Sequence, residues 1–308
     1  MNNSDLEQEL ELLRKKAVLT RNGRVIAAIG LTLIVIGIVY SYAYEFFEFS
    51  FFVFILSLVV ALAWPNPDKD TFLKVYQERI TYATLRSILD ECSYEHDKGI
   101  SEYVIRSTEM MNTGDRFSSN DYISGKYKDV KFDMSDIEIE EQHKDSDGDT
   151  TYTTIFKGQW YIIDFNKPFK ANFQIVEKDF RSAIVKRGLF VRKEERKNKV
   201  EVEDIEFNKQ FNIYALNDLD VFYVLTPKII EKIKEVNNRI PGSLLLCFVD
   251  NKLHIGLNNG KDLFEASINR KVRLANEVEK TKKEISIITD FIDILNLDND
   301  LFDKEKEV

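Results

Sequence analysis

The sequence predicts an α+β protein in which an N-terminal two-helix transmembrane hairpin is followed by a cytoplasmic, mainly antiparallel α+β domain and a long C-terminal helix. Three observations support this fold class. Residues 25–44 and 46–64 are two nearly continuous apolar runs. Between residues 117 and 257, short runs alternate apolar with polar residues and are separated by turn residues, which is typical of strands. Residues 270–297 place apolar residues four and three apart, which is typical of a helix.

The two apolar runs are long enough to cross a membrane. The first has no charged residue and the second has only Glu48, close to its start, whereas the hydrocarbon core of a bilayer takes about 20 residues of helix. The turn between them is rich in aromatic residues, and Trp64 precedes Pro65, so both positions suit a membrane interface. The lack of a polar face argues against a hairpin buried in a soluble core. A cleaved signal peptide is disfavoured because a second span follows the first.

Basic residues near the span ends set the expected orientation. Five precede the first span, none lies in the turn, and Lys69, Lys74 and Arg79 follow the second span. Because basic residues favour the cytoplasmic side, both termini are expected in the cytoplasm. The sequence thus predicts an integral membrane protein of a bacterial inner (cytoplasmic) membrane, with the lipid bilayer as its first partner.

The charge balance disfavours nucleic acid as a partner. The 308 residues carry a net charge of −9, and an acidic protein binds a polyanion poorly without a concentrated basic surface. The two cysteines, Cys92 and Cys247, lie far apart in the sequence. In a cytoplasmic domain they are expected to be free thiols.

The chain divides into five expected parts. These are a cytoplasmic amphipathic helix (1–24), the transmembrane hairpin (25–64), a helical connector (65–115), the soluble α+β domain (116–268), and a C-terminal helix with an acidic tail (269–308). In the connector we expect helices over 68–91 and 100–111, separated by a polar stretch. Both terminal helices carry apolar stripes of coiled-coil type, Leu6, Leu10, Leu13 and Ala17 in the first. The first could pair with a second copy of the chain or with another helix of the same chain, or it could be a surface amphipathic helix leading into the membrane. The C-terminal helix could pair with the N-terminal helix, with a second copy of the chain, or with the domain.

Strands and one helix are expected in the soluble domain. The helix begins after Thr226, a good N-cap, with Pro227 in its first turn, and two β-rich halves are expected to flank it or pack with it. The expected strands are 121–127, 130–139, 152–156, 159–165, 171–176, 200–204, 206–214, 218–225, 243–249 and 252–257.

One basic cluster lies at residues 181–199. It is either a solvated loop beside a strand or a contact for anionic lipid headgroups. The candidate lipid-contact residues are Lys186, Arg187, Arg192, Lys193, Arg196 and Lys197.

The sequence predicts no catalytic, cofactor-binding or metal-binding residue. Asp145, Asp147 and Asp149 have the spacing of a calcium loop. The sixth and twelfth positions, however, are Thr150 and Phe156 instead of Gly and Glu, so a polar hairpin tip is expected. The three histidines are scattered, and no phosphate-binding loop, dinucleotide fingerprint or nucleophile elbow is present in the sequence.

Several blocks carry a family resemblance. They read DYISGKYKDVKFDMSDIEI at 121–139, TIFKGQWYIIDFNKPF at 154–169, VEVEDIEFNKQFNIYALND at 200–218, YVLTPKIIEKI at 223–233 and CFVDNKLHIGL at 247–257. In these blocks the chain resembles a family of bacterial membrane proteins known as domain of unknown function 3137, whose members also look like it in having paired N-terminal spans. The resemblance implies no activity, so no catalytic residue is carried over.

These observations favour a non-enzymatic, membrane-anchored cytoplasmic binding or scaffold module of unknown ligand, oligomeric through its terminal helices or holding a protein partner. A membrane-associated enzyme acting on lipid or envelope intermediates is the main rival. It would need polar groups such as Asp121, Lys126, Asp164, Glu203 and Asp204 to converge in a pocket. A ligand-sensing effector coupled to the hairpin is a further alternative. A small channel is disfavoured because no ionisable residue lies near mid-membrane in the spans.

Overall fold

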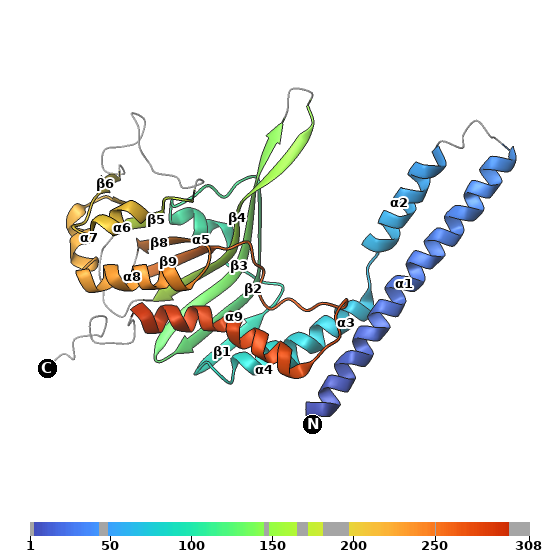
Figure 1. The fold of residues 1–308 in the computed structure, drawn as a ribbon, viewed down its shortest axis with the longest axis horizontal. Helices are drawn as coiled ribbons and strands as arrows, with labels where there is room; N and C mark the ends of the chain where they lie inside the picture. Colours follow the sequence, from blue (N-terminus) through green and yellow to red (C-terminus); the bar gives the residue numbers. More distant parts are fainter. Residues whose placement is uncertain are drawn as a thin grey trace. The chain divides into compact units, whose positions relative to one another are not determined.

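A computed structural model describes residues 3–42, 49–144, 148–164, 172–180, 197–249 and 251–295. The chain forms two compact units (Figure 1). A helical unit comprises Met1–Ala83 and Glu265–Thr281, and a sheet unit comprises Thr84–Phe264 and Lys282–Val308. The predicted α+β class is confirmed.

The helical unit contains the two apolar helices. Helix α1 (Asn3–Tyr42) is continuous and merges the predicted N-terminal helix with the first predicted span, and α2 (Phe49–Ala63) packs along it. Two helical stretches, Asn3–Ile38 and Phe51–Leu85, are long and apolar enough to cross a membrane. Only 6% and 0% of their most apolar windows are buried. Such exposure is unlike that of core helices in a soluble protein.

A polar contact links the two apolar helices. The Thr32 hydroxyl lies 2.7 Å from the Ser57 hydroxyl and donates to the Ala28 carbonyl at 2.8 Å. Thr32 is buried although its neighbours are exposed. Small hydroxyl residues of this kind let two helices approach closely in an apolar medium.

The apolar stripe of α1 is buried within its own chain. Leu10 and Ala17 pack with Phe72, Tyr76 and other residues of α3 (Pro67–Tyr76), the following π-helix η2 (Gln77–Tyr82), and the returning segment 265–281. Of the alternatives left open for this stripe, packing with another part of the same chain is therefore the one observed. The stripe is not available as a coiled-coil seam in this structure.

Charged residues of α1 also hold the returning segment. Arg14 donates to the Ile268 carbonyl at 2.8 Å and is paired with Glu11 at 2.7 Å. The Arg14 guanidinium holds the pKa of the Glu11 carboxyl below its usual range. Glu7 accepts from the Leu274 amide at 2.9 Å. Leu274 begins α9 (Leu274–Leu295), where an acidic partner complements the unpaired amides of the first turn.

The sheet unit is built on one nine-stranded sheet whose strand pairs are all antiparallel. The strand order is β1-β2-β3-β4-β9-β8-β5-β7-β6. The strands are β1 (Glu91–Glu95), β2 (Arg116–Tyr127), β3 (Val130–Lys144), β4 (Thr150–Asp164), β5 (Phe173–Glu177), β6 (Asn198–Val200), β7 (Phe211–Ala215), β8 (Ser243–Val249) and β9 (Lys252–Asn258). The expectation of two β-rich halves is corrected, because the β8–β9 hairpin pairs with β4 on one side and β5 on the other.

Both faces of the sheet carry apolar residues, because alternate residues of a strand point to opposite faces. On β3, Phe132 and Met134 belong to one apolar cluster, whereas Ile137 and Ile139 belong to the other. The first cluster includes side chains of α8 (Pro227–Arg239) and of the second half of α9. The second includes Ile105 of α5 (Glu102–Ser107). We call these the α8 face and the α5 face.

Several elements differ from the sequence prediction. The expected strand 200–204 overlaps the observed β6 only at Val200. β1 lies in the stretch that was expected to be polar and irregular. The expected strand 206–214 begins as helix α6 (Ile205–Gln210), and the expected strand 218–225 is helix α7 (Asp218–Val224). Both helices have N-cap side chains: Asp204 accepts from the Phe207 amide at 2.8 Å, and Asn217 from the Leu219 amide at 3.2 Å. These caps outweigh the β propensity of the residues that follow.

The C-terminal helix is present as predicted, but its apolar stripe is covered. Ile285, Ile288 and Phe291 are fully buried in the core of the sheet unit. Pairing with a second copy through these residues would require them to leave that core.

Candidate functional site

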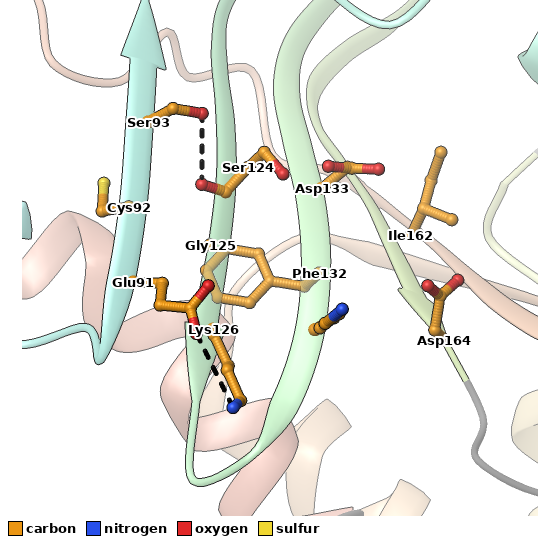
Figure 2. A pocket seen from close by; sticks show the side chains of 11 residues that line it. Glu91, Cys92, Ser93, Ser124, Gly125, Lys126, Phe132, Asp133, Ile162 and Asp164 are labelled. Carbon is orange, nitrogen blue, oxygen red and sulfur yellow. Dashed lines mark hydrogen bonds and ion pairs between the residues drawn. The ribbon is translucent and has the colours of Figure 1, made fainter.

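A polar groove lies on the α5 face of the sheet, across β1 to β4 (Figure 2). The strand register builds it in two rows. Glu91, Lys126 and Lys131 form one row, because Glu91 is opposite Lys126 and Lys126 is opposite Lys131. Ser93, Ser124, Asp133 and Ile162 form the next row by the same pairing.

The groove has a volume of about 420 Å³, which lies within the range of about 300–1,000 Å³ for small-molecule sites. Its lining residues are Glu91, Cys92, Ser93, Ser124, Gly125, Lys126, Lys131, Phe132, Asp133, Ile162 and Asp164. Most of them present polar atoms, so the groove suits a ligand that hydrogen-bonds.

The two lysines of the groove are in different electrostatic settings. Lys126 is paired with Asp129 at 2.8 Å and lies 3.7 Å from Glu91. The Asp129 carboxylate raises the pKa of Lys126. Lys131 is exposed and stands directly opposite Lys126 on the neighbouring strand, where like charges repel. Among the described residues Lys131 has no ion-pair partner, so an anionic group in the groove would relieve this repulsion.

Hydrogen-bonding groups occupy the second row. Asp133 accepts from the Tyr122 hydroxyl at 2.8 Å. Burial, helped by Asp133, raises the pKa of Tyr122 to about 12, so this hydroxyl stays a donor. The Ser93 hydroxyl donates to the Ser124 carbonyl at 3.4 Å. The remaining lone pairs of Asp133 can therefore accept hydrogen bonds from a polyhydroxylated ligand. The serine hydroxyls can donate hydrogen bonds to such a ligand or accept them from it.

The groove is better suited to binding than to covalent catalysis. The Cys92 side chain packs against the apolar cluster of the α8 face, on the other side of the sheet from the groove. Burial there raises the pKa of its thiol to about 11, which disfavours the thiolate that acts as nucleophile. Activated nucleophiles have lowered pKa values or an adjacent base. The described lining residues present neither arrangement.

A buried aromatic pair lies beside the groove in the sheet. His254 is opposite Ile162, and the Trp160 indole donates to His254 Nδ1 at 3.3 Å. Burial, with a smaller contribution from the Lys252 charge, lowers the pKa of His254 to about 4. Neutral His254 therefore serves as an acceptor inside the sheet.

The structure brings together only part of the polar set named for the enzyme hypothesis. Lys126 and Asp164 both line the groove. Asp121 is buried beyond the groove and accepts from His96 Nδ1 at 2.8 Å. Glu203 is exposed, and Asp204 caps α6 and pairs with Lys234 at 2.6 Å. The five residues therefore do not share one pocket.

Most of the basic cluster lies outside the described residues. That applies to Lys186, Arg187, Arg192, Lys193 and Arg196, for which lipid contact stays a prediction. Lys197 is buried, with its ammonium 3.8 Å from Glu109, so this side chain is not offered to a lipid surface in this structure. In the predicted hairpin tip, Asp145 and Asp147 also lie outside the described residues, and Asp149 is exposed.

The family comparison covers the second half of the sheet unit. Residues 154–297 match the family model described as a protein of unknown function, DUF3137. The predicted resemblance is confirmed over this segment, which runs from β4 to the end of α9. Of the groove residues, Ile162 and Asp164 lie inside the DUF3137 match, and those on β1, β2 and β3 precede it.

Other comparisons add no assignment. No curated protein matches the chain significantly. Among solved structures, the crystal structure of the mycobacterial trehalose monomycolate transport factor A, TtfA, is similar with a TM-score of 0.39 and 9% sequence identity. The similarity covers 71% of this chain and 94% of that chain. No residue of this chain receives a role from it.

Sequence reasoning missed the core of the groove. Lys131 and Asp133 lie within the expected strand 130–139, which is present as part of β3. Their convergence with Glu91 and Ser93 depends on β1, which was not expected to be a strand. The ECSYE alternation at 91–95 was the available signal for it.

Proposed function

We propose that this protein is a membrane-anchored binding module whose sheet unit holds a small polar ligand in the groove across β1 to β4. The groove itself carries the proposal, because it combines a ligand-sized volume with an unpaired lysine, carboxylates and hydroxyls. The expected ligand carries one anionic group, for Lys131, and hydroxyl groups, for Asp133 and the two serines.

The two apolar helices support membrane anchoring. They are long enough to span, and their apolar windows are almost entirely exposed. By the distribution of basic residues, both termini and the sheet unit belong on the cytoplasmic side of a bacterial inner membrane. The module would then hold its ligand, or a partner that responds to it, close to the membrane.

Binding without chemistry is supported by two groups next to the groove. The Cys92 thiol, which packs against the α8 face, and the Tyr122 hydroxyl, which is bonded to Asp133, both have raised pKa values, so neither is prepared to act as a nucleophile or base near neutral pH. Oligomerisation through the terminal helices is not part of the proposal, because their apolar stripes are buried within the chain.

The experiment is a gentle-detergent purification of the intact protein, followed by denaturing extraction and mass spectrometry of retained small molecules. A retained anionic, hydroxyl-bearing compound near one equivalent supports the proposal. Protein free of any small molecule, when purified from cells that need the gene, would contradict tight ligand binding. If a second protein co-purifies in a stoichiometric amount and no small molecule is retained, the result would favour a scaffold function instead.

A further inference from the structure

A second polar site lies in the sheet unit, on the α8 face of β3. One carboxylate oxygen each from Asp121 on β2, Asp136 on β3 and Asp262 after β9 lies within 4.8 Å of the others. Asp121 is 1% exposed and Asp136 is 3% exposed, whereas Asp262 is exposed. Two of these three acids are therefore inside the protein, unlike acids that cluster on a surface.

The strands fix the positions of the buried acids. Asp136 is opposite Gln159 of β4, in regular register. The β2–β3 register shifts between Asn120 and Ile123, and Asp121 at this irregularity has a φ of 54°. A β-bulge re-aims a side chain in this way. The loop after β9 brings in the third acid, since the amide of Leu263 donates to Asp136 Oδ2 at 2.6 Å.

The hydrogen-bond partners of these acids are donors. Asp136 Oδ1 accepts from Gln159 Nε2 at 2.8 Å. Asp121 accepts from His96 Nδ1, from Asn120 Nδ2 at 2.5 Å and from the Tyr94 hydroxyl. A carboxylate has about four acceptor sites, so both acids keep lone pairs for a further partner.

Positive charge is scarce around the cluster. Among the described residues no lysine or arginine forms an ion pair with any of the three acids, and the one basic side chain paired with them is His96, which contacts Asp121. Buried carboxylates are ordinarily paired or bound to a metal ion.

An unpartnered hydroxyl lies on the same face of the sheet as the cluster. Tyr161 projects from the same side of β4 as Gln159, and it is completely buried. Its hydroxyl has no hydrogen-bond partner among the described residues. Tyr161 lies two residues along β4 from Gln159, which itself donates to Asp136 Oδ1. Leaving a buried polar atom without a hydrogen-bond partner destabilises a protein by about 1–3 kcal/mol, so such an atom usually has a partner.

We propose that Asp121, Asp136 and Asp262 bind one Ca²⁺ ion, with the Tyr161 hydroxyl hydrogen-bonded to its ligand sphere. Carboxylate oxygens are the ligands of hard divalent cations. Three oxygens within 4.8 Å of one another can share one ion at Ca–O distances of about 2.3–2.6 Å. Ca²⁺ is favoured over Mg²⁺ because Mg²⁺ gives up its water reluctantly and is seldom held by protein carboxylates alone, whereas two of these three acids are buried. The site lies apart from the groove, so it stands independently of the proposed ligand.

The test is isothermal titration calorimetry of CaCl₂ into the full chain in detergent, after treatment with a chelator. Wild-type protein should bind one Ca²⁺, more tightly than Mg²⁺. Asp262→Asn removes an exposed ligand without disturbing the core, and it should weaken binding by about tenfold or more. The matched control is Asp97→Asn, because Asp97 is exposed and is not in the cluster; its affinity should equal that of wild type.

Tyr161→Phe gives a second readout. It should leave one Ca²⁺ site and weaken it by about tenfold, the usual effect of losing an outer partner of a metal ligand. The proposal is overturned by wild-type protein that binds neither cation at millimolar concentration. It is equally overturned if Asp262→Asn binds Ca²⁺ as well as wild type, or if Mg²⁺ binds more tightly than Ca²⁺.

Discussion

The buried pair of Trp160 and His254 makes a definite prediction about stability and pH. His254 is 4% exposed, and its pKa is lowered from 6.5 to about 4, mainly by burial. In the unfolded chain the imidazole takes up a proton near pH 6.5. Between about pH 6.5 and 4 the unfolded state therefore binds more protons than the folded state, so the free energy of unfolding falls as the pH falls.

The magnitude follows from the width of this pH window. Each pKa unit corresponds to about 1.4 kcal/mol, so a shift from 6.5 to about 4 costs roughly 3 kcal/mol by pH 4. Above about pH 6.5 the imidazole is neutral in both states, and its contribution does not change. The substitution His254→Asn removes the titration, while the Asn side-chain oxygen can replace Nδ1 as acceptor for the Trp160 indole.

The assay is urea unfolding from pH 4 to 8, followed by Trp160 fluorescence in a Trp64→Phe background. At each pH, the free energy of unfolding of the His254→Asn variant is subtracted from that of the protein that keeps His254. This difference cancels the contributions of the other titrating groups. The difference should be level above about pH 6.5 and fall by roughly 3 kcal/mol towards pH 4. The control is His143→Asn, because His143 is exposed. This substitution should leave the pH dependence of the free energy of unfolding unchanged. A level difference across the whole range would refute the buried, neutral state of His254.

Three further predictions concern packing and topology. Ile288→Ala should lower the free energy of unfolding by about 2–5 kcal/mol, since a fully buried side chain is removed; the oligomeric mass in detergent should stay the same, because Ile288 packs within its own chain. Gly256→Ala should destabilise by about 1–3 kcal/mol, because an added Cβ would meet the Trp160 ring at 2.8 Å; a denaturation midpoint equal to that of wild type would contradict this packing. Reporter fusions at residue 45 and at the C-terminus should give external and cytoplasmic signals, respectively; the opposite pattern would reverse the predicted orientation.

The periodic parts of the fold were predictable from the sequence. Two apolar runs, the capped helix after Thr226 and the hairpin around residue 251 each carry a strong local signal, and each is present. Helices α6 and α7 were missed because their N-caps, Asp204 and Asn217, precede short segments rich in residues that also favour strands. The β2–β3 turn was also predicted, since the expected strands 121–127 and 130–139 leave Lys128 and Asp129 between them, and both of these residues have positive φ without an Asn-Gly pair.

The sites depend on contacts between distant residues, which periodicity does not reveal. Lys126 and Asp164 were named as candidates, but their common groove also requires β1 and the register of four strands. Asp121 was named without its partners, because Asp136 and Asp262 reach it through the β2 irregularity and the loop after β9. The sequence alone gives no means of pairing positions 121, 136 and 262.

The measurement that tests the central claim most directly compares ligand retention in two matched variants. The groove variant is Lys131→Gln with Asp133→Asn, which removes both charges while keeping hydrogen-bonding groups. The control is Lys144→Gln, an exposed residue at the far end of β3. If the groove is the binding site, the groove variant loses the retained molecule and the control keeps it at the wild-type ratio. Equal retention by both variants would show that the ligand binds elsewhere and would contradict the proposed function of the groove.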